Sequence, residues 1–393
     1  MKKIVSITSV VALVGSMLMP LASAANTADN SITGYGSTNY SNVTNTNDVK
    51  VTNVSDTKIV NNVRTVSDTG GNSASYNTLG GAVSSGNAVN NVSLSSVGNI
   101  NTTTVKVGTA GGNETGNSIT GALSTNTSDV TNTNKVRVLN DNTAWIENKV
   151  DAKSLTGDNS ASYNTGVGTA MSGNASTNVG VATRVNDSAT GVTLGLGGVG
   201  GNSGLNSTTG ALSNNFATIL NSNDVSVKNV SDAKVLNDVE TLSGTGRNFS
   251  SYNTLGGHVL SGNAATGVSL DTTGNINTTT LAIAMGGFAN EAGSAITGAS
   301  STNVSGVDNS NKFTVESRNN KGSSEDAPDY CKVSREAFHH QECWGVYNYD
   351  EDFSLTGDNS GSFNTGLASV LSGVASIQKT VKTWLNDTFT AIN

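Results

Sequence analysis

Four copies of one short motif run through this chain, and their spacing restricts the fold more than any other feature of the sequence. Each copy has an aromatic residue followed by Asn and Thr, and Ser-Gly-Asn-Ala follows a few residues later. The aromatic residues are Tyr76, Tyr163, Tyr252 and Phe363, which are 87, 89 and 111 residues apart. In the last copy the second motif has Val374 in place of Asn. A recurring period of this kind predicts a repeat architecture, in which each unit packs against its neighbours.

A second, longer period of 176 residues lies over the first. Residues 51–56 (Val-Thr-Asn-Val-Ser-Asp) match residues 227–232, and Gly-Asn-Ile-Asn at 98–101 recurs at 274–277. Alternate copies are therefore closer relatives, and the chain consists of a duplicated pair of units. The predicted organisation is a leader at 1–24, a first pair of units at 25–206, a second pair at 207–376 with an insertion at 320–352, and a C-terminal cap at 377–393.

The units are predicted to consist of short strands and turns. Residues 48–51, 135–138, 225–228 and 312–315 alternate between polar and apolar side chains, as strands with one buried face do. Gly- and Asn-rich runs between such segments suit tight turns. Because only 5% of the residues are aromatic and 13% are charged, we expect a narrow core of Val, Ala, Leu and Thr, with stacked Asn side chains at its polar turns.

The fold prediction is all-β: an elongated β-solenoid or β-helix-like repeat array with one loop insertion. A string of small β-sandwich domains is the alternative, because a repeat of about 88 residues is also long enough for a domain.

The repeat motif also resembles a known group of proteins. Residues 156–166 read Thr-Gly-Asp-Asn-Ser-Ala-Ser-Tyr-Asn-Thr-Gly, and Ser-Gly-Asn-Ala follows at 172–175. This pattern is similar to the Asn/Thr/Gly-rich repeat proteins predicted on the surface of candidate-phyla (Patescibacteria-like) bacteria, and the resemblance covers most of residues 31–376. It implies an exported, β-helical surface protein and carries over no catalytic residues.

The first 24 residues have the pattern of a bacterial secretory leader. Lys2 and Lys3 precede a mostly apolar segment at 4–21, and Ala-Ser-Ala at 22–24 fits the small-x-small cleavage rule. An uncleaved anchor is the alternative, although the segment is short for a membrane span. Loss of Lys2 and Lys3 would change the formal net charge from −8 to −10, which argues against nucleic acid as a partner. We expect a secreted or cell-surface protein with no transmembrane segment after cleavage.

The C-terminal end departs from the repeat. Its apolar residues fall largely at helical spacing, and they are Val370, Val374, Ile377, Val381, Trp384, Leu385 and Ile392. This spacing predicts an amphipathic helix that covers the open end of the solenoid, as atypical terminal repeats do. The alternative is a helix that docks onto another subunit or onto the envelope.

An insertion in the fourth unit is the place where a specific function is expected. The third spacing exceeds the second by 22 residues, and the excess, which is rich in aromatic and charged residues, falls between Val315 and Phe353. Insertions into repeats form loops, often on the binding face. The predicted partner-binding residues are Tyr330, Phe338, Trp344, Tyr347 and Tyr349. Exposed aromatic rings contact proteins and stack on sugars; alternatively, these rings form a small core within the loop.

Both cysteines, Cys331 and Cys343, lie in this insertion. In an exported protein we expect them to form a disulfide that closes the loop. With His339 and His340 they could instead form a metal site, but the spacing matches no strong zinc pattern. We therefore expect no metal and no cofactor.

The chain offers few groups for catalysis. It has only three His, and His258 stands alone, so we expect it on an exposed rung. Asp158 and Asp358 recur in Thr-Gly-Asp-Asn, where a turn role is favoured over an acid or a nucleophile. No catalytic residue is predicted.

The expected function is that of a structural fibre or stalk whose loop adheres to a cell-surface glycan or a protein receptor, with self-association as a further expectation. The alternative is a β-helical carbohydrate-active enzyme, either a polysaccharide lyase or a hydrolase.

Overall fold

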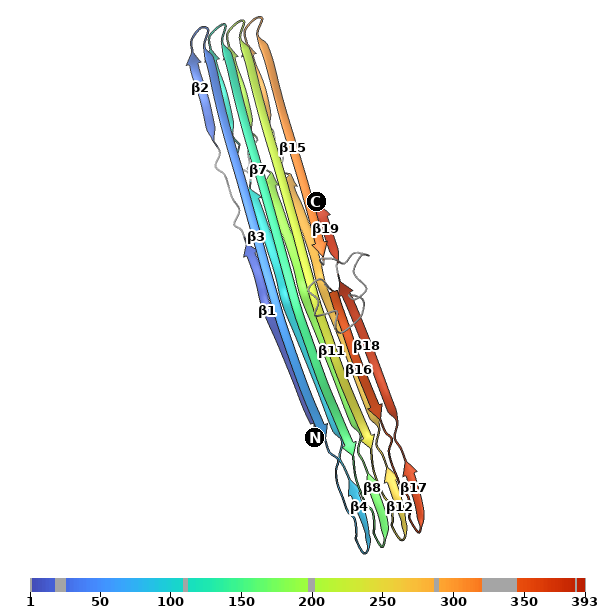
Figure 1. The fold of residues 1–393 in the computed structure, drawn as a ribbon. Coiled ribbons are helices and arrows are strands. Elements are labelled where there is room, and N and C mark those ends of the chain that lie inside the picture. Colours follow the sequence, from blue (N-terminus) through green and yellow to red (C-terminus); the bar gives the residue numbers. More distant parts are fainter. Residues whose placement is uncertain are drawn as a thin grey trace, which may run out of the picture.

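The computed structural model describes residues 2–17, 26–108, 112–196, 202–285, 290–319, 345–385 and 387–392, and every regular element in them is a strand. The strands form four sheets in which equivalent strands of successive repeats lie side by side (Figure 1). One long sheet contains β3 (Thr38–Asp68), β7 (Thr125–Gly157), β11 (Asn214–Gly246), β15 (Thr302–Asn319) and β16 (Gly345–Leu355). The other long sheet contains β1 (Lys2–Met17), β5 (Ala88–Gly108), β9 (Ala175–Leu196), β13 (Ala264–Met285), β18 (Ala375–Leu385) and β19 (Thr388–Ile392).

Two short sheets lie at the two ends of the molecule (Figure 1). The first contains β2 (Thr27–Thr33), β6 (Glu114–Thr120), β10 (Ser203–Thr209) and β14 (Glu291–Thr297). The second contains β4 (Gly80–Ser84), β8 (Val167–Met171), β12 (Gly256–Leu260) and β17 (Leu367–Leu371).

One repeat forms one rung of a parallel β-solenoid. Thr38 of β3 lies opposite Thr125 of β7, which lies opposite Asn214 of β11, and the pairing of β7 with β11 continues without a slip to their last residues. Since every named strand pairs with its equivalents in the neighbouring repeats, the β-solenoid prediction is confirmed and the tandem-sandwich alternative is wrong. The rung length, which the sequence left open, is 87 to 89 residues, in agreement with the first two motif spacings.

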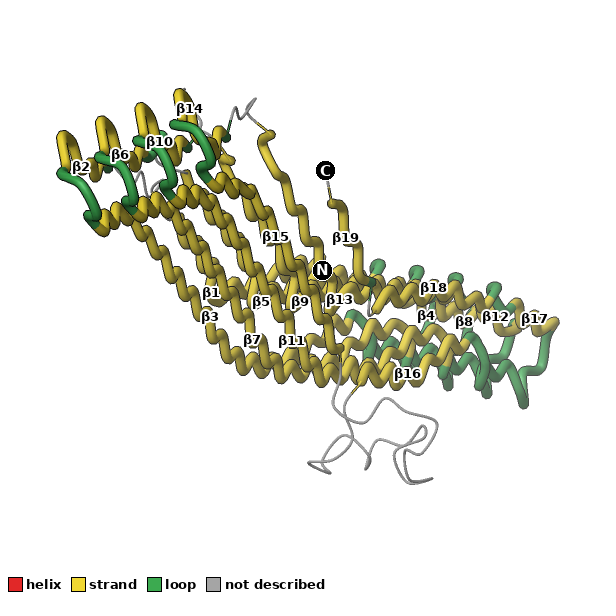
Figure 2. Tube along the Cα trace, turned by 90° about the horizontal axis from the view of Figure 1, so that it is seen from above, coloured by secondary structure: helices red, strands yellow, loops and turns green. Residues whose placement is uncertain are grey.

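Each rung is flattened into two layers (Figure 2). One layer is a single long strand, such as β3. The chain returns through β4 and β5 and continues into β6, the first strand of the next rung. The two layers contact each other directly, because Ser41 of β3 donates a hydrogen bond to the carbonyl of Ala28 in β2, and Asn53 of β3 donates one to Thr103 of β5.

The long dimension of the molecule lies across the stack and not along it. β7 has 33 residues, so at about 3.3 Å per residue it is about 110 Å long. Four stacked rungs occupy only about 19 Å at a strand spacing of about 4.8 Å. The molecule is therefore a thin slab, whereas the sequence suggested elongation along the repeat axis.

The core consists of three apolar clusters between the layers. The first packs Val49 and Val51 of β3 and their equivalents against Val105, Val107 and theirs. The other two form in the same way around Val63 and around Ile59. Small β-branched side chains fill the narrow gap between the sheets, as predicted.

Polar side chains separate these clusters and form ladders along the stack. Asn53 donates to Asn140 at 2.7 Å, and Asn140 donates to Asn229 at 2.7 Å. Asn126 and Asn148 occupy the centres of similar ladders. Each of these ladder amides has a partner in a neighbouring rung, which reduces the penalty for burying it. The predicted Asn ladders are thus present.

The predicted C-terminal helix is wrong. Residues 375–385 form β18 and residues 388–392 form β19, and both pair in parallel with β13. The helical spacing was misleading because it spans a turn: Val370 belongs to β17, Val374 lies between the two strands, and Ile377 belongs to β18. The last rung is an ordinary rung of the solenoid.

The predicted leader contributes a further strand. β1 pairs in parallel with β5, from Lys2 opposite Val89 to Met17 opposite Thr104. Residues 2–17 therefore cover the edge that β5 would otherwise present. Cleavage after Ala24 stays a prediction.

Candidate functional site

The insertion leaves the solenoid from the long strand of the fourth rung. β15 pairs with residues 214–231 of β11, and β16 pairs with residues 234–244. Between them the partner strand advances by only two residues, Asp232 and Ala233, while the fourth rung passes from Asn319 to Gly345. Both flanking strands keep their register, so the scaffold accommodates the insertion without rearrangement.

Most of the predicted binding residues lie outside the described part of the chain. These are Tyr330, Phe338 and Trp344, together with both cysteines of the predicted disulfide and with His339 and His340. The backbone of Tyr347 and Tyr349 is described, and it lies in β16 opposite Leu236 and Asp238. The predicted insertion at 320–352 therefore extends too far at its C-terminal end, because residues 345–352 belong to β16 and continue the rung.

A column of one aromatic and two cationic side chains lies beside the insertion. Lys58, Trp145 and Lys234 occupy the same position in three successive rungs, and Gly345 follows them in the fourth. The Nζ atoms of Lys58 and Lys234 lie 5.5 and 4.8 Å from the centre of the Trp145 ring, within the range of a cation–π interaction. Burial lowers the pKa of Lys234, which is only 1% exposed.

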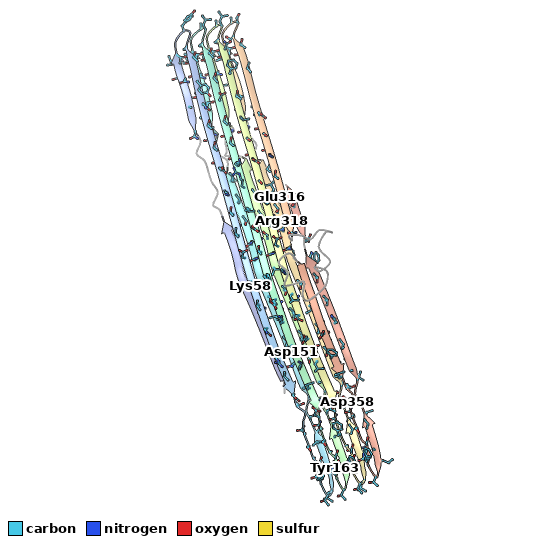
Figure 3. All side chains as sticks on the ribbon, viewed as in Figure 1. Lys58, Asp151, Tyr163, Glu316, Arg318 and Asp358 are labelled. Atoms are coloured by element: carbon cyan, nitrogen blue, oxygen red, sulfur yellow. The ribbon has the colours of Figure 1, made fainter. Side chains whose placement is uncertain are left out.

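A buried acidic side chain lies where the insertion begins, at the C-terminal end of β15. Arg318, near the end of β15, contacts the buried carboxylate of Asp232, with 3.4 Å between Nη2 and Oδ2. Figure 3 shows Arg318 near the point where the fourth rung is interrupted, with Lys58 further along the same layer. The two ends of the insertion are therefore held next to one buried anion and one buried cation.

A charged pair replaces an apolar pair inside the last rung. Asp350 lies in register with Val239, and Lys379 in register with Val268, two residues of one apolar cluster. Lys379 Nζ is 2.8 Å from Asp350 Oδ2, and the carboxylate is almost fully buried. Burial raises the pKa of Asp350 to about 6, the neighbouring Asp352 contributes in the same direction, and Lys379 opposes the change. Sequence reasoning missed this pair because its partners lie on different layers.

The aromatic residues of the repeat motif form a continuous stack at one end of the slab. Tyr76 and Tyr163 have ring centres 5.0 Å apart, Tyr163 and Tyr252 4.7 Å, and Tyr252 and Phe363 4.9 Å, all nearly parallel. The two central rings are 48% and 47% exposed, whereas Tyr76 and Phe363 are 77% and 74% exposed. The sequence identified these residues only as a repeat marker, although their one-per-rung spacing predicts the stack.

A shallow groove of about 360 Å³ crosses β5, β9, β13 and β18. It forms where Gly180 and Gly267 lack side chains, and Asn91, Asn178 and Gln378 line it. None of its lining residues is acidic, basic or a histidine. The groove can hydrogen-bond a polar ligand, but its own side chains supply no general acid or base.

The other residues that were considered for catalysis, one His and two Asp, lie at an exposed position of a strand and in turns. His258 is exposed on β12, with Nδ1 2.6 Å from the hydroxyl of Ser369 in the next rung. Asp158 and Asp358 have φ values of 51° and 57°, which places them in left-handed turns, and Figure 3 shows Asp358 near one end of the slab. Among the described residues there is no group of three or more His, Cys, Asp or Glu side chains that could hold a metal ion.

These observations define a flat, parallel β-solenoid with an insertion in its last rung. No family model, curated protein or solved structure matches the chain. Within the part of the chain that the structure describes, no helix is long and apolar enough to cross a membrane.

Proposed function

We propose that this chain is an exported structural repeat protein of the cell surface and that its insertion adheres to a cell-surface glycan or a protein receptor. The observation that supports this most strongly is the position of the insertion, which interrupts a strand whose two halves keep their register with β11. The scaffold does not need these residues for its pairing, so a role outside the scaffold accounts for them. Their aromatic content suits recognition.

The leader and the surface composition support the same proposal. The leader pattern at 1–24 would direct export. The chain is only 13% charged and has a net charge of −8, which suits a surface that stays wettable without strong attraction to nucleic acid. Fractionation of cells that produce the tagged chain should place it outside the cytoplasm, with 1–24 removed. A full-length chain in the cytoplasm would contradict export.

Adhesion is tested by restoring the strand of the last rung. Residues 320–344 are replaced with Asp-Ala, the two residues that join the same positions of β11. This variant should keep the circular dichroism of the parent but lose at least tenfold in binding to cells or to a glycan array. A second variant keeps the insertion and replaces only Tyr330, Phe338 and Trp344 with Ser, so it tests the aromatic side chains separately from the loop. Unchanged binding by both variants would overturn the adhesive role.

A carbohydrate-active enzyme is the weaker candidate. A polar groove across parallel strands could hold a polysaccharide, but the groove in this solenoid has no acid or base among its lining residues. Release of unsaturated products or reducing ends from a polysaccharide panel by the purified chain would restore this candidate.

A further inference from the structure

Both ends of the rung stack present strand edges. In the described part of the chain, β2, β3 and β4 pair on one side only, and so do β14, β15, β16 and β17 at the other end. Open strand edges are templates for pairing with another chain. The backbone, amide, charged and aromatic groups at each edge indicate which partner fits it.

The backbone of the first rung fits that of the last. Thr125, Asn214 and Thr302 each donate an N–H to the carbonyl just before the equivalent residue of the preceding rung, namely Ser37, Ser124 and Ser213. Thr38 holds the donor position in the first rung, and Ser301 holds the acceptor position in the last. If the first rung of a second copy lies against the last rung of this one, the N–H of Thr38 meets the carbonyl of Ser301 and the hydrogen-bond ladder continues.

The Asn ladders have a direction that also matches. Asn47 donates to Asn134, Asn134 to Asn223, and Asn223 to Asn311. The ladder thus ends with an amide NH₂ on the last rung and begins with an amide oxygen on the first. Contact between unlike ends joins a donor to an acceptor, whereas contact between like ends does not.

Charged side chains at equivalent positions also favour contact between the last rung of one copy and the first rung of the next. Asp48, Lys135, Asp224 and Lys312 occupy one position in successive rungs, so a following Asp48 would extend the alternation. At another position Arg64 of the first rung pairs with Asp151 of the second, and Glu240 and Glu351 occupy this position in the third and fourth rungs. The Arg64 of a second copy would lie opposite Glu351. Opposite charges in register stabilise such pairs, and like charges disfavour them.

The exposed aromatic residues agree with this arrangement. Tyr76 and Phe363 terminate the aromatic stack and are both far more exposed than the rings between them. A second copy would place Tyr76 on Phe363 and continue a column that already has spacings of 4.7–5.0 Å. Stacked aromatic pairs of this kind are favourable beyond the area that they bury.

We propose that this chain stacks head to tail on copies of itself, with the last rung of one copy against the first rung of the next. The contact is between unlike surfaces and does not close, so it produces a filament. Each copy adds about 19 Å, four rungs of about 4.8 Å. Every copy would then present its insertion at regular intervals, which increases avidity. The proposal rests on the structural role proposed above and specifies its partner as a second copy.

The leader would prevent this contact until it is removed. β1 pairs with residues 89–104 of β5, which is the edge that β18 and β19 of a preceding copy would occupy. Stacking along the whole rung therefore requires loss of residues 1–24. All four rungs and their mutual pairing remain in residues 25–393.

One feature of the last rung slows the proposed stacking. The Asp350–Lys379 pair would lie against Val63 and Val92 of the next copy, which are the equivalents of these two residues in the first rung. Lys379 is 44% exposed and would lose water on contact. Replacing the pair with two Val, as in the other rungs, should accelerate filament growth severalfold.

Glycines at the edges allow a test that leaves the single chain intact. A Cβ on Gly173 would lie 2.5 Å from the Gly86 carbonyl oxygen, and one on Gly121 would lie 2.6 Å from that of Gly34. A Cβ on Gly86 or Gly34 meets nothing within 4 Å, because these residues belong to the first rung. G34A/G86A therefore obstructs only the contact with a preceding copy.

The last rung offers the complementary variant. A Cβ on Gly246 would lie 2.0 Å from the Gly357 oxygen, whereas a Cβ on Gly357 meets nothing within 4 Å. G357A therefore obstructs only the contact with a following copy. G34A/G86A keeps an unobstructed last rung, and G357A keeps an unobstructed first rung. One molecule of each variant can therefore still pair through these two edges.

The experiment uses residues 25–393, purified as monomer and examined by electron microscopy, fibre diffraction and analytical ultracentrifugation. We expect filaments with a reflection near 4.8 Å along the filament axis. G34A/G86A and G357A alone should each stay monomeric, and an equal mixture should form dimers and no filaments. The full chain, with residues 1–24 retained, should assemble at least tenfold more slowly.

Three results would overturn the proposal. These are monomers of residues 25–393 at high concentration, filaments from either glycine variant alone, or dimers of one variant by itself, which would indicate contact between like edges. Equal assembly by the full chain would overturn the role assigned to β1. Loss of adhesion with intact filaments, or of filaments with intact adhesion, separates this proposal from the adhesive function.

Discussion

At the scale of single residues, buried Asn side chains determine how the rungs fit together. Asn140 accepts hydrogen bonds from Asn53 and Thr103 and donates to Thr190 and Asn229. It therefore connects three rungs along the stack and both layers across it. Because it is fully buried, no water replaces these partners when the side chain is removed.

Asn140→Ala should lower the free energy of unfolding by about 3 kcal/mol, because buried donors and acceptors lose their partners. The measurement is chemical denaturation of residues 25–393 in the G34A/G86A background, where stacking does not interfere. Asn178→Ala is the matched control, since Asn178 is exposed and its ladder bond is to Asn91 alone; its effect should stay below about 0.5 kcal/mol. Equal effects of the two changes would contradict the buried-ladder account.

Asp350 should make the last rung more stable in acid. Its pKa is about 6 in the folded chain, against 3.8 ordinarily, so folding takes up a proton between these values. This contribution is fully present below about 3.8 and is lost as the pH rises through about 6. Asp350→Asn should abolish the pH dependence of hydrogen exchange in β16 over this window. An unchanged profile would assign it to another group.

Some residue roles were predictable from the sequence and others were not. The Asn ladders follow from repeated Asn at constant spacing, since each repeat places the same amide at the same height. The Asp350–Lys379 pair does not follow, because its two residues are distant in sequence and meet only when the opposing layers are placed in register. The Lys58–Trp145–Lys234 column was predictable in the same way as the Asn ladders, because its residues are 87 and 89 residues apart, and it was missed because only the motifs were compared between repeats.

At the scale of elements, alternation identified the long strands correctly. Residues 48–51, 135–138, 225–228 and 312–315 lie in β3, β7, β11 and β15, and they pair in register. The strands at the C-terminus were missed because the apolar residues that were compared there belong to β17, to the turn after it and to β18, so their spacing is not that of one element. The Ser-Gly-x-Ala turn at 372–375 was the signal that should have excluded a helix.

Equivalent glycines in successive rungs should respond differently to the same change. Gly173→Ala places a Cβ 2.5 Å from a carbonyl of the preceding rung, and it should destabilise the chain by about 3 kcal/mol or more. Gly86→Ala, in the same motif of the first rung, meets open space and should leave thermal unfolding of the monomer unchanged. The comparison is made by calorimetry at low concentration. Similar losses in both variants would show that the glycine acts through its turn and not through rung stacking.

At the scale of the whole molecule, the repeat predicted a solenoid but not its proportions. A period near 88 residues is compatible with several short rungs, with one compact domain or with one very long rung. The structure has the last of these, in which β3 alone extends over 31 residues. Nothing in the strand pattern distinguishes a turn at each Gly-Asn cluster from a strand that continues through it.

The distance between two points on one long strand tests this arrangement most directly. Spin labels at the exposed positions Thr46 and Asn62 of β3, with Cys331 and Cys343 replaced by Ser, can be measured by pulsed dipolar spectroscopy. Sixteen residues of extended strand predict a distance of about 53 Å. A compact domain of about 88 residues is only about 31 Å across. A distance near 53 Å would confirm the long rung, and one below about 35 Å would contradict it.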